Sequence, residues 1–473
     1  MTAPRLETEV CVVGGGPAGS TYAQRLAQLG HRVLVLERST FPRPHVGEAL
    51  TPEIWPLLEF LGVRDAVEAA GFLCTTQARV RWVDEEERLV ELEAGDPGLT
   101  VERSRFDELL LDRAKAAGAA VLEAAIARRP QRTRSGWQVE VSAGSEPVLV
   151  DARFVADASG RSSVLGGRRE PTSPRTLAIH GSWRLDRAGD VETRVAAARE
   201  AWFWAARLPD GSVSAMAFVD PELLHRHAGG KRGLERLYLR LLDEAGLLAG
   251  FGDGRLEGAV AACDATCYLD PEPIGEDWIK LGEAAFAIDP LSSAGVRAAI
   301  QSALAGSVAT HTLLSDGGDA AAALAFYRDA QRHSAEQHRA WAAGFYAQHR
   351  LHRDAPFWRR RSAELAEPAQ ARPQGDLRDL LPDSVRLAPG AALVAVPCAV
   401  GDRVELRRAL AHPSLERPVA YLAGVELAPL VEGLEQAPTL EEAVLGWAAE
   451  MPLERALGVA DWLGRHGLLA AAP

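Results

Sequence analysis

The first forty residues combine two short apolar runs with a helical pattern between them. Residues 8–13 form an apolar run that leads into a glycine cluster, and apolar positions over residues 17–29 recur at a helical period. A second apolar run follows at residues 33–36. The pattern predicts a strand, a helix and a second strand, which is the start of an α/β domain.

Later segments show the same two kinds of periodicity. They predict a helix over residues 101–117, strands at 121–122 and within 136–155, a strand over 278–281 and a long helix from about residue 295. Between about residues 172 and 222 the chain predicts β-strands that carry Trp183, Trp202 and Trp204. We expect the sheet formed by these strands to wall a pocket.

The C-terminal part has a different character. A basic helical stretch over residues 320–362 is followed by a segment rich in Pro, Gln and Gly at residues 367–375, where we place a domain boundary. The last hundred residues predict short strands and then helices, one of which begins with a capping box formed by Thr439 and Glu442. This order of elements is similar to a small winged-helix module.

Composition excludes several classes of protein. The chain has 473 residues, of which 47% are hydrophobic and 25% charged, so it can bury a large core in two or three domains. With 52 basic and 65 acidic residues its formal charge is −13, which argues against a nucleic-acid-binding protein. No apolar run is long enough for a membrane span and no signal segment precedes the first strand, so we expect a cytoplasmic protein. The five cysteines are scattered without C-x-x-C or paired-His spacing, and no metal site is predicted.

Charge also bears on the winged-helix-like tail. From residue 377 onward it contains 8 basic and 13 acidic residues, a net charge of −5. An acidic surface repels DNA, so we expect the tail to dock a peptide or a partner protein instead.

A glycine-rich motif lies between the first strand and the first helix. Residues Gly14, Gly16 and Gly19, with Ala18 between the last two, fit G-x-G-x-x-G and would bring the helix N-terminus close to a pyrophosphate. Glu37 closes the second strand, where a carboxylate accepts hydrogen bonds from a ribose. Together they predict a dinucleotide site; the alternative is a glycine-rich turn with Glu37 as a solvated charge.

Four motifs, in this order, resemble those of FAD-dependent group A monooxygenases and their flavin-dependent halogenase branch. The matching segments are 36–50, 101–107, 155–161 and 282–296. The resemblance extends over about 300 residues and leaves residues 367–473 outside it.

The resemblance implies an α/β fold with a Rossmann-type FAD-binding domain, an interleaved β-sheet substrate domain and a small C-terminal α+β, winged-helix-like module. The expected ranges are 1–170 with 260–320 for the FAD domain, 171–259 with parts of 65–100 for the substrate domain, 321–366 for a helical connector and 376–473 for the docking module.

The resemblance also implies further FAD-binding residues. These are Arg38, Arg103, Asp157, Gly282, Glu283, Ser293, Ala294 and Gly295. Arg103 is expected to neutralise the phosphates or to hold the adenosine side, with a solvated arginine at a helix terminus as the alternative. Glu283 stands where the family usually has Asp, so its carboxylate reaches the ribityl hydroxyls on a stem one methylene longer. The helix that begins near Gly295 would stabilise the reduced flavin's anionic region.

The halogenase branch carries a catalytic lysine and a W-x-W-x-I-P strand. The region that should hold the lysine, residues 72–82, contains none, and Trp202 and Trp204 begin the second motif while Pro209 falls two residues late. An arginine cannot replace the lysine because its guanidinium stays protonated. The sequence therefore favours hydroxylation over halogenation.

The resemblance thus predicts hydroxylation of a phenol or indole through a flavin C4a-hydroperoxide. FAD and O2 are required, with NADH, NADPH or a separate flavin reductase as the electron source. Trp202 and Trp204, with Trp82 and Met216, are candidates for the wall around the ring, and His45 or Glu48 for handling protons.

Relatives that hydroxylate tryptophan within a peptide during quinone-cofactor maturation also lack the lysine. We therefore expect a peptide- or carrier-tethered substrate, no nucleic acid and no membrane span. Three alternatives are a halogenase, an isoprenoid-type flavin reductase and a non-catalytic flavoprotein subunit.

Overall fold

The computed structural model describes residues 4–91, 95–143, 146–185, 192–227, 230–248, 254–362, 385–434 and 439–471. The predicted linker at residues 367–375 lies outside these ranges. The chain divides into two compact units, one formed by residues 1–313 with 327–366 and the other by residues 314–326 with 367–473.

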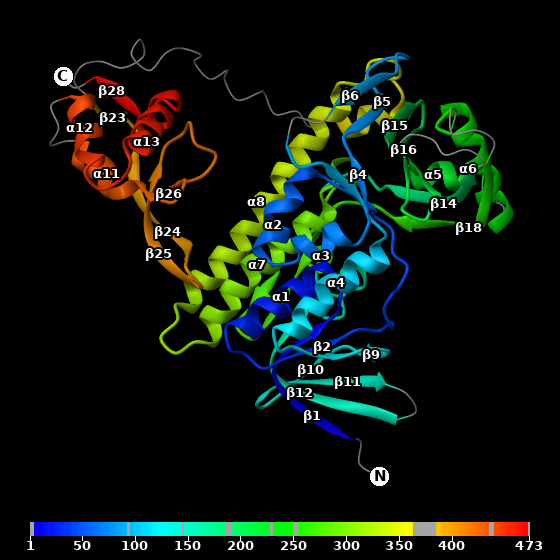
Figure 1. Cartoon of the computed structure of the whole chain (residues 1–473), viewed down its shortest axis with the longest axis horizontal. Helices are drawn as coiled ribbons and strands as arrows, with labels where there is room; N and C mark the ends of the chain where they lie inside the picture. The colour runs from blue at the N-terminus through cyan, green and yellow to red at the C-terminus, as the bar shows by residue number, and fades with distance from the viewer. Residues whose placement is uncertain are drawn as a thin grey trace. The chain divides into compact units, whose positions relative to one another are not determined.

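A parallel sheet with the strand order of a Rossmann fold forms the core of the first unit (Figure 1). Its parallel strands are, in spatial order, β8 (Ala120–Leu122), β2 (Val33–Leu36), β1 (Arg5–Val13), β12 (Glu146–Asp157) and β21 (Trp278–Lys280). Helix α1 (Pro17–Gln28) connects β1 to β2, so the predicted strand, helix and strand are confirmed. All four residues of β2 are buried, as expected for a parallel strand covered on both faces.

Two longer helices and several antiparallel strands complete this layer. Helix α4 (Arg103–Ala116) precedes β8, and helix α7 (Gly295–Leu314) follows β21. The added strands are β9 (Ala125–Ala127), β10 (Gln131–Thr133), β11 (Gly136–Ala143) and β20 (Ile274–Gly275).

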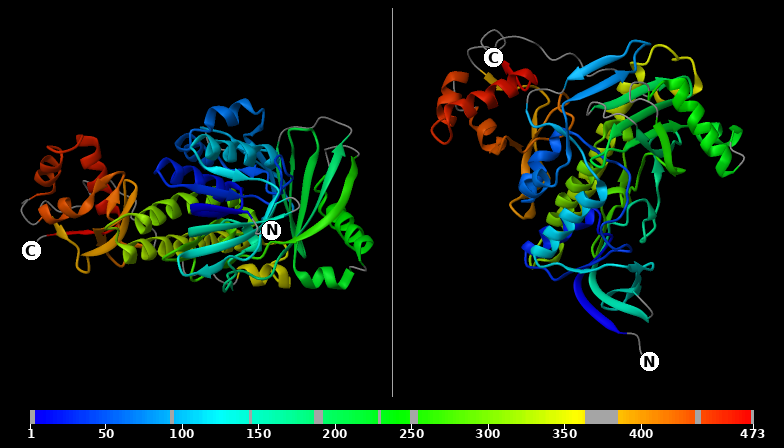
Figure 2. Two further views of the ribbon diagram at one scale, coloured as in Figure 1. Left: turned by 90° about the horizontal axis from the view of Figure 1, so that it is seen from below. Right: turned by 45° about the vertical axis from the view of Figure 1, so that its right-hand side comes forward.

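A second, mostly antiparallel sheet is the one that carries the tryptophans. Its spatial order is β18 (Gly254–Asp264), β14 (Leu177–Leu185), β17 (Val213–Val219), β16 (Ala201–Arg207), β15 (Thr193–Ala198), β5 (Gln77–Arg81) and β6 (Arg88–Glu91). Helices α5 (Pro221–His227) and α6 (Lys231–Ala245) lie on the side of this sheet that faces away from the Rossmann-type sheet (Figures 1 and 2). They pack on its Phe203 face, so the opposite face is left for other contacts.

Shorter elements connect these layers. The remaining strands are β3 (Ala49–Leu50), β4 (Leu73–Thr75), β7 (Gly98–Thr100), β13 (Glu170–Pro171), β19 (Tyr268–Leu269) and β22 (Phe286–Ala287). The remaining helices are η1 (Pro52–Ile54), α2 (Trp55–Phe60), α3 (Arg64–Ala69), η2 (Gly160–Ser162), η3 (Gly282–Ala284), η4 (Pro290–Ser292), α8 (Ala320–Ala347) and α9 (Pro356–Ser362).

The second unit consists of short strands followed by helices, in the predicted order. Its strands are β23 (Val385–Leu387), β24 (Ala392–Val400), β25 (Arg403–Ala411), β26 (Tyr421–Leu422), β27 (Val425–Glu426) and β28 (Leu469–Ala471), and its helices are α11 (Leu427–Gly433), α12 (Leu440–Trp447) and α13 (Leu453–Arg465). The predicted cap of α12 is confirmed, since the Thr439 hydroxyl accepts a hydrogen bond from the Glu442 amide at 3.2 Å. Nowhere in the described ranges does a helix combine the length and the apolar character needed to cross a membrane.

Candidate active site

A cavity of about 680 Å³ joins the Rossmann-type sheet to the tryptophan-bearing sheet. Fourteen of the residues predicted for the site line it, namely Gly14, Gly16, Ala18, Glu37, Arg38, His45, Glu48, Arg103, Trp202, Trp204, Gly282, Glu283, Ser293 and Gly295. Gly19, Asp157 and Ala294 do not line it and contribute in other ways.

The glycine turn after β1 is packed backbone against backbone. Gly14 has a φ of +110°, and a Cβ at this position would lie 2.3 Å from the carbonyl oxygen of Ala158. A Cβ at Gly19 would lie 1.9 Å from the carbonyl oxygen of Gly14. Gly16 precedes α1, which has no side-chain cap, so the first amides of this helix are open to an anion.

Glu37 is buried and holds the glycine turn in place. Its side chain is 4% exposed, which excludes the solvated-charge alternative. Oε2 accepts a hydrogen bond from the Gly15 amide at 2.8 Å and Oε1 accepts one from the Ser39 amide at 2.9 Å. A carboxylate has further lone pairs, so Glu37 can still accept hydrogen bonds from ribose hydroxyls.

Arg43 is a residue that the sequence reasoning missed. Its Nη2 lies 3.4 Å from the place where a Cβ of Gly16 would be, at the N-terminus of α1. Its Nη2 donates to Asp107 at 3.3 Å, and its buried Nε forms an ion pair with Glu37 Oε1 at 3.7 Å but makes no hydrogen bond within the described residues. A cationic donor beside an uncapped helix N-terminus suits a phosphate. The available signal was an arginine in the loop that follows the second strand, seven residues after Leu36.

Arg103 is buried and serves the loop over residues 45–48. The residue is 6% exposed, which excludes the alternative of a solvated arginine. Its guanidinium donates to both carboxylate oxygens of Asp107, at 2.8 and 3.1 Å, and to the carbonyl oxygens of Val46 and Gly47 at 3.0 and 3.3 Å. These bonds fix the loop against the cavity, and a direct contact with FAD stays a prediction.

Asp157 stabilises the turn after β12 through hydrogen bonds to its carboxylate. It is fully buried, and its carboxylate accepts hydrogen bonds from Ser159 and from the Leu165 amide. The turn that it supports supplies Gly160 and Arg161 to the cavity wall.

The segment after β21 brings a second glycine against the first motif. Gly282 has a φ of +54°, and a Cβ there would lie 3.2 Å from the Ala18 Cβ. Glu283, the residue with the longer stem, is partly exposed and forms an ion pair with Arg161 at 3.2 Å. Its carboxylate thus has a protein partner in addition to any ribityl hydroxyl.

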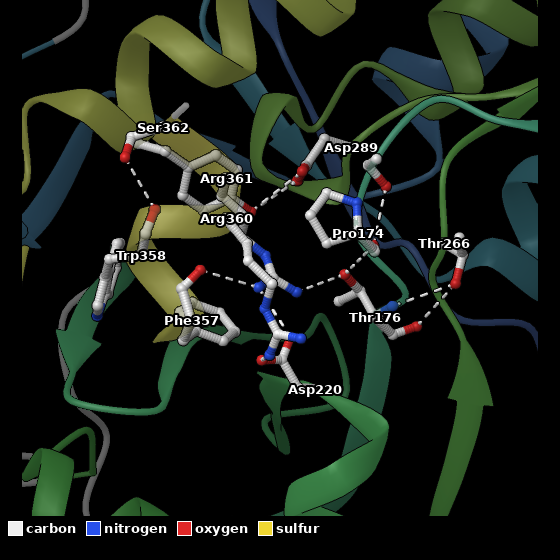
Figure 3. A network of polar contacts seen from close by, with 12 residues as sticks. Pro174, Thr176, Asp220, Thr266, Asp289, Phe357, Trp358, Arg360, Arg361 and Ser362 are labelled. Atoms are coloured by element: carbon white, nitrogen blue, oxygen red, sulfur yellow. Dashed lines mark hydrogen bonds and ion pairs between the residues drawn. The ribbon is translucent and has the colours of Figure 1, made fainter. Parts of the chain in front are cut away.

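Asp289 organises the turn that leads into α7. Its carboxylate accepts hydrogen bonds from the Leu291 amide at 3.0 Å and from the Tyr346 hydroxyl at 3.0 Å, and it lies close to Arg361 in Figure 3. Burial raises the pKa of Asp289 above its usual value. In the same turn Ser293 has a φ of +49° and lines the cavity beside Gly295, the first residue of α7.

One face of the tryptophan-bearing sheet forms the apolar end of the cavity. Trp202 pairs with Phe218 and Trp204 pairs with Met216 on adjacent strands, and all four side chains line the cavity. Trp183 lies on the opposite face of this sheet, where it pairs with Val213 and donates to the Tyr238 hydroxyl. Directly opposed residues share a face, so the register decides which tryptophans reach the cavity.

One correction and one unusual feature concern the predicted tryptophans. Trp82 is not part of the wall; it packs behind Trp202, with ring centroids 6.3 Å apart. The indole N–H groups of Trp202 and Trp204 are buried and have no hydrogen-bond partner within the described residues. A buried donor without a partner costs free energy, so an oxygen atom of a bound group would stabilise either one.

Comparison with known proteins agrees with this geometry. A family model described as FAD binding domain matches residues 7–208. The tryptophan 2-halogenase of Chondromyces crocatus is 29% identical over 345 residues, covering 68% of this chain and 64% of that protein. The putative FAD-dependent oxidoreductase LodB of Marinomonas mediterranea is 27% identical over 372 residues, covering 75% of this chain and 97% of that protein.

Two solved structures match nearly the whole chain. The peptidyl tryptophan dihydroxylase QhpG, essential for tryptophylquinone cofactor biogenesis, has a TM-score of 0.77 at 26% identity and covers 98% of this chain and 100% of that chain. The flavin-dependent halogenase CmlS has a TM-score of 0.78 at 24% identity and covers 99% of this chain and 96% of that chain, a likeness of fold. Residues 7–208 thus match an FAD binding domain, and the whole chain is similar to FAD-dependent monooxygenases and halogenases.

The residues along the cavity fit FAD. Gly14 and Gly19 leave no space for a Cβ in this turn, so the backbone packs closely there, and Glu37 supplies acceptors next to the end of β2. The open N-terminus of α1 and the cationic side chain of Arg43 suit the pyrophosphate, and the residues from Gly282 to Gly295 line another part of the cavity.

The two residues predicted to handle protons, His45 and Glu48, differ in exposure and in the direction of their pKa shift. His45 is exposed, and its Nδ1 donates to the Val46 carbonyl oxygen at 2.7 Å; desolvation by the surrounding protein and the charge of Arg103 lower its pKa. Glu48 is buried, accepts a hydrogen bond from the Gly47 amide at 2.9 Å, and has a pKa raised chiefly by burial. Both line the cavity, and their catalytic roles stay predictions.

No lysine is among the cavity-lining residues in the part of the chain that the structure describes. Lys280 is buried in an ion pair with Asp270, and Lys115 pairs with Asp112 and Glu123 on the surface of α4. The described residues also contain no group of three or more His, Cys, Asp or Glu side chains placed to hold a metal ion.

Proposed function

We propose that this protein is an FAD-dependent monooxygenase that hydroxylates an electron-rich aromatic ring, either a phenol or an indole. The observation that carries the proposal is the single cavity in which the FAD-binding residues meet an aromatic and apolar sheet face. The chain spans 64% of the length of the tryptophan 2-halogenase it matches. The activity proposed for this chain therefore rests on the residues that line its own cavity.

Each part of the cavity has a distinct task in this reaction. Bound FAD, once reduced, supplies an electrophilic oxygen atom derived from O2. The protein holds the cofactor through the glycine turn and Glu37, and the apolar face with Trp202 and Trp204 orients the ring and excludes water. His45 and Glu48 lie close enough to the cavity to exchange protons with it. Electrons come from NADH, NADPH or a separate flavin reductase.

Halogenation is the second candidate, favoured by the sequence likeness to halogenases. A halogenase of this kind needs an amine to carry hypohalous acid to the ring. Neither the region over residues 72–82 nor the described lining of the cavity contains a lysine. Hydroxylation needs no such residue and is the better fit.

Reaction in the presence of labelled oxygen and chloride separates the two candidates. We expect one 18O atom from 18O2 in the product of a phenol, an indole or a tryptophan-containing peptide, and no chlorine, because no amine stands in the cavity. Mass spectrometry of the product, with reduced FAD supplied, makes the measurement. A product that gains chlorine or bromine whenever halide is present, and no 18O, would contradict the proposal.

We further propose that the ring is presented on a peptide or a carrier protein. QhpG is described as acting on peptidyl tryptophan, and a chlorinase from Pseudomonas fluorescens, 27% identical over 62% of this chain, is described as acting on a pyrrole-2-carbonyl group on a peptidyl-carrier protein. The second unit supports a docking role, since from residue 377 onward the chain has a net charge of −5 and its Glu450 and Glu454 are exposed.

Added salt should raise the KM for a tethered, basic substrate and leave the KM for a free substrate unchanged. An exposed acidic surface attracts a basic peptide over a range of about 10 Å at 0.1 M salt, and screening shortens this range. We expect the KM for a basic tryptophan-containing peptide to rise several-fold between low and moderate salt, while the KM for free tryptophan stays constant. The double variant Glu450→Gln with Glu454→Gln should reduce the response, and Glu59→Gln with Glu86→Gln, two exposed glutamates of the first unit, serves as its control. Equal salt responses of both substrates would refute docking.

A further inference from the structure

His180 lies on the cavity face of the tryptophan-bearing sheet. On β14 it is paired with Ala261 of β18 on one side and with Met216 of β17 on the other, and Met216 is paired with Trp204 of β16. Directly opposed residues of antiparallel strands point to the same face, with Cβ atoms about 5 Å apart. His180 therefore belongs to the same row of side chains as Met216 and Trp204, and it lines the cavity with them.

The backbone around His180 is held in one position. A shift of register, a β-bulge or irregularity, separates His180 from Ser182 in the pairing with β18. Such bulges re-aim side chains and are frequent beside active sites. Gly181 points to the opposite face, where a Cβ would lie 3.1 Å from the Tyr238 ring, and the Tyr238 hydroxyl donates to the Ala215 carbonyl oxygen at 2.9 Å. Helix α6 thus packs on the face of the sheet opposite the cavity and limits movement of the backbone at Gly181.

The imidazole of His180 is free to react. It has no hydrogen bond or ion pair with any residue that the structure describes, and its strand neighbours on the cavity face are Ala261 and Met216. Partial burial lowers its pKa below the usual value, so the ring is neutral near pH 7 and carries an unused lone pair. Cys263, on the same face of β18 as Ala261, and Asp264, at the end of that strand, also line the cavity, and neither bonds to His180.

The two predicted proton-handling residues of this cavity already have hydrogen-bond partners. His45 uses Nδ1 on the Val46 carbonyl oxygen, and Glu48 is tied to the Gly47 amide and the Ser214 hydroxyl. His180 stands instead among Trp204, Met216 and Phe218, where the apolar face would receive the ring. If an aromatic substrate binds against these residues, a ring nitrogen of His180 can accept a hydrogen bond from its N–H or O–H group.

We propose that His180 accepts the proton that the aromatic substrate loses during hydroxylation, an inference that rests on the proposed monooxygenase function. A π electron pair of the ring forms the new C–O bond to one oxygen atom derived from O2 while the O–O bond breaks. The second oxygen atom leaves as water, and reduced FAD supplies the two electrons that this requires. The N–H bond of an indole, or the O–H bond of a phenol, then breaks. Its electron pair neutralises the ring, and the proton moves to the imidazole nitrogen of His180 and from there to water.

The test compares His180→Gln and His180→Ala with the wild type, all loaded with reduced FAD and mixed with O2 and one of three probes: phenol, indole or a tryptophan-containing peptide. Hydroxylated product per flavin oxidised should fall about 100-fold in both variants, the low end of what general-base catalysis contributes. FAD content should stay unchanged and hydrogen peroxide should replace the missing product. Added imidazole should restore product formation to His180→Ala, a rescue that a purely structural role does not allow. His227→Gln, an exposed histidine of α5, is the matched control.

The outcomes separate this inference from the function on which it rests. Product formation by His180→Gln within twofold of the wild type, or a failure of imidazole to restore His180→Ala, overturns the role of His180 alone. If the wild type oxidises reduced FAD but hydroxylates none of the three probes, the proposed function fails and the role of His180 fails with it.

Discussion

Gly19→Ala will abolish FAD binding under ordinary assay conditions. A Cβ at this position would lie 1.9 Å from the Gly14 carbonyl oxygen and 3.1 Å from the Ala158 Cβ. The closest atom is backbone and cannot rotate away, so the turn that receives the pyrophosphate has to open. We expect the Kd for FAD to rise at least 100-fold, or about 2.8 kcal/mol, measured by calorimetric titration of the apoprotein.

Gly458→Ala is the matched control for this variant. Gly458 lies in α13 of the second unit, and a Cβ there would meet no atom within 4 Å. FAD affinity should be unchanged, and the helix should gain up to about 1 kcal/mol because alanine is a better helix former than glycine. Retention of FAD by Gly19→Ala with a Kd within threefold of the wild type would show that the turn is not the pyrophosphate site.

Arg361→Ala will cause the largest loss of stability that we expect from removing one side chain. Arg361 of α9 has a side chain only 2% exposed, and its Nη1 lies 2.8 Å from Asp220 Oδ1. The same guanidinium donates to the Thr176 hydroxyl at 2.7 Å and stacks over Phe357 at 3.8 Å (Figure 3). Its removal breaks a buried ion pair, which costs about 3–5 kcal/mol. Chemical denaturation of the FAD-loaded protein, followed by flavin fluorescence, measures the loss.

Arg360→Ala provides a comparison within the same helix. Arg360 also pairs with Asp220, but its side chain is 46% exposed and water can replace its contacts. We expect a loss of at most about 1 kcal/mol, as for other exposed ion pairs. Equal losses from the two variants would mean that burial does not determine the contribution of these arginines.

Local features of the sequence predicted much of the FAD-binding half of the site. The spacing of Gly14, Gly16 and Gly19 between a strand and a helix is a local constraint, because the motif works through its own turn and the adjacent helix N-terminus. The boundaries of β2 and the cap at Thr439 were predictable for the same reason, since each depends on residues a few positions apart.

Contacts between segments that are distant in the sequence could not be predicted from local sequence patterns. Arg103 spans from α4 to the carbonyl oxygens of Val46 and Gly47, more than fifty positions away in sequence. Arg43 reaches the N-terminus of α1 through the folding of the intervening strand and loop. No periodicity or motif within a short window contains the information for such contacts, because they depend on which elements pack together.

The sequence by itself determined that a strand, a glycine turn and a helix build a dinucleotide site, because these features depend on local periodicity and on backbone space. It also determined that residues 72–82 offer no lysine. Only the tertiary structure decided that Trp202, Trp204 and His180 face the cavity while Trp183 faces α6. The physical reason is that side chains alternate along a strand, so the face each one occupies depends on the register between strands that are far apart in the chain.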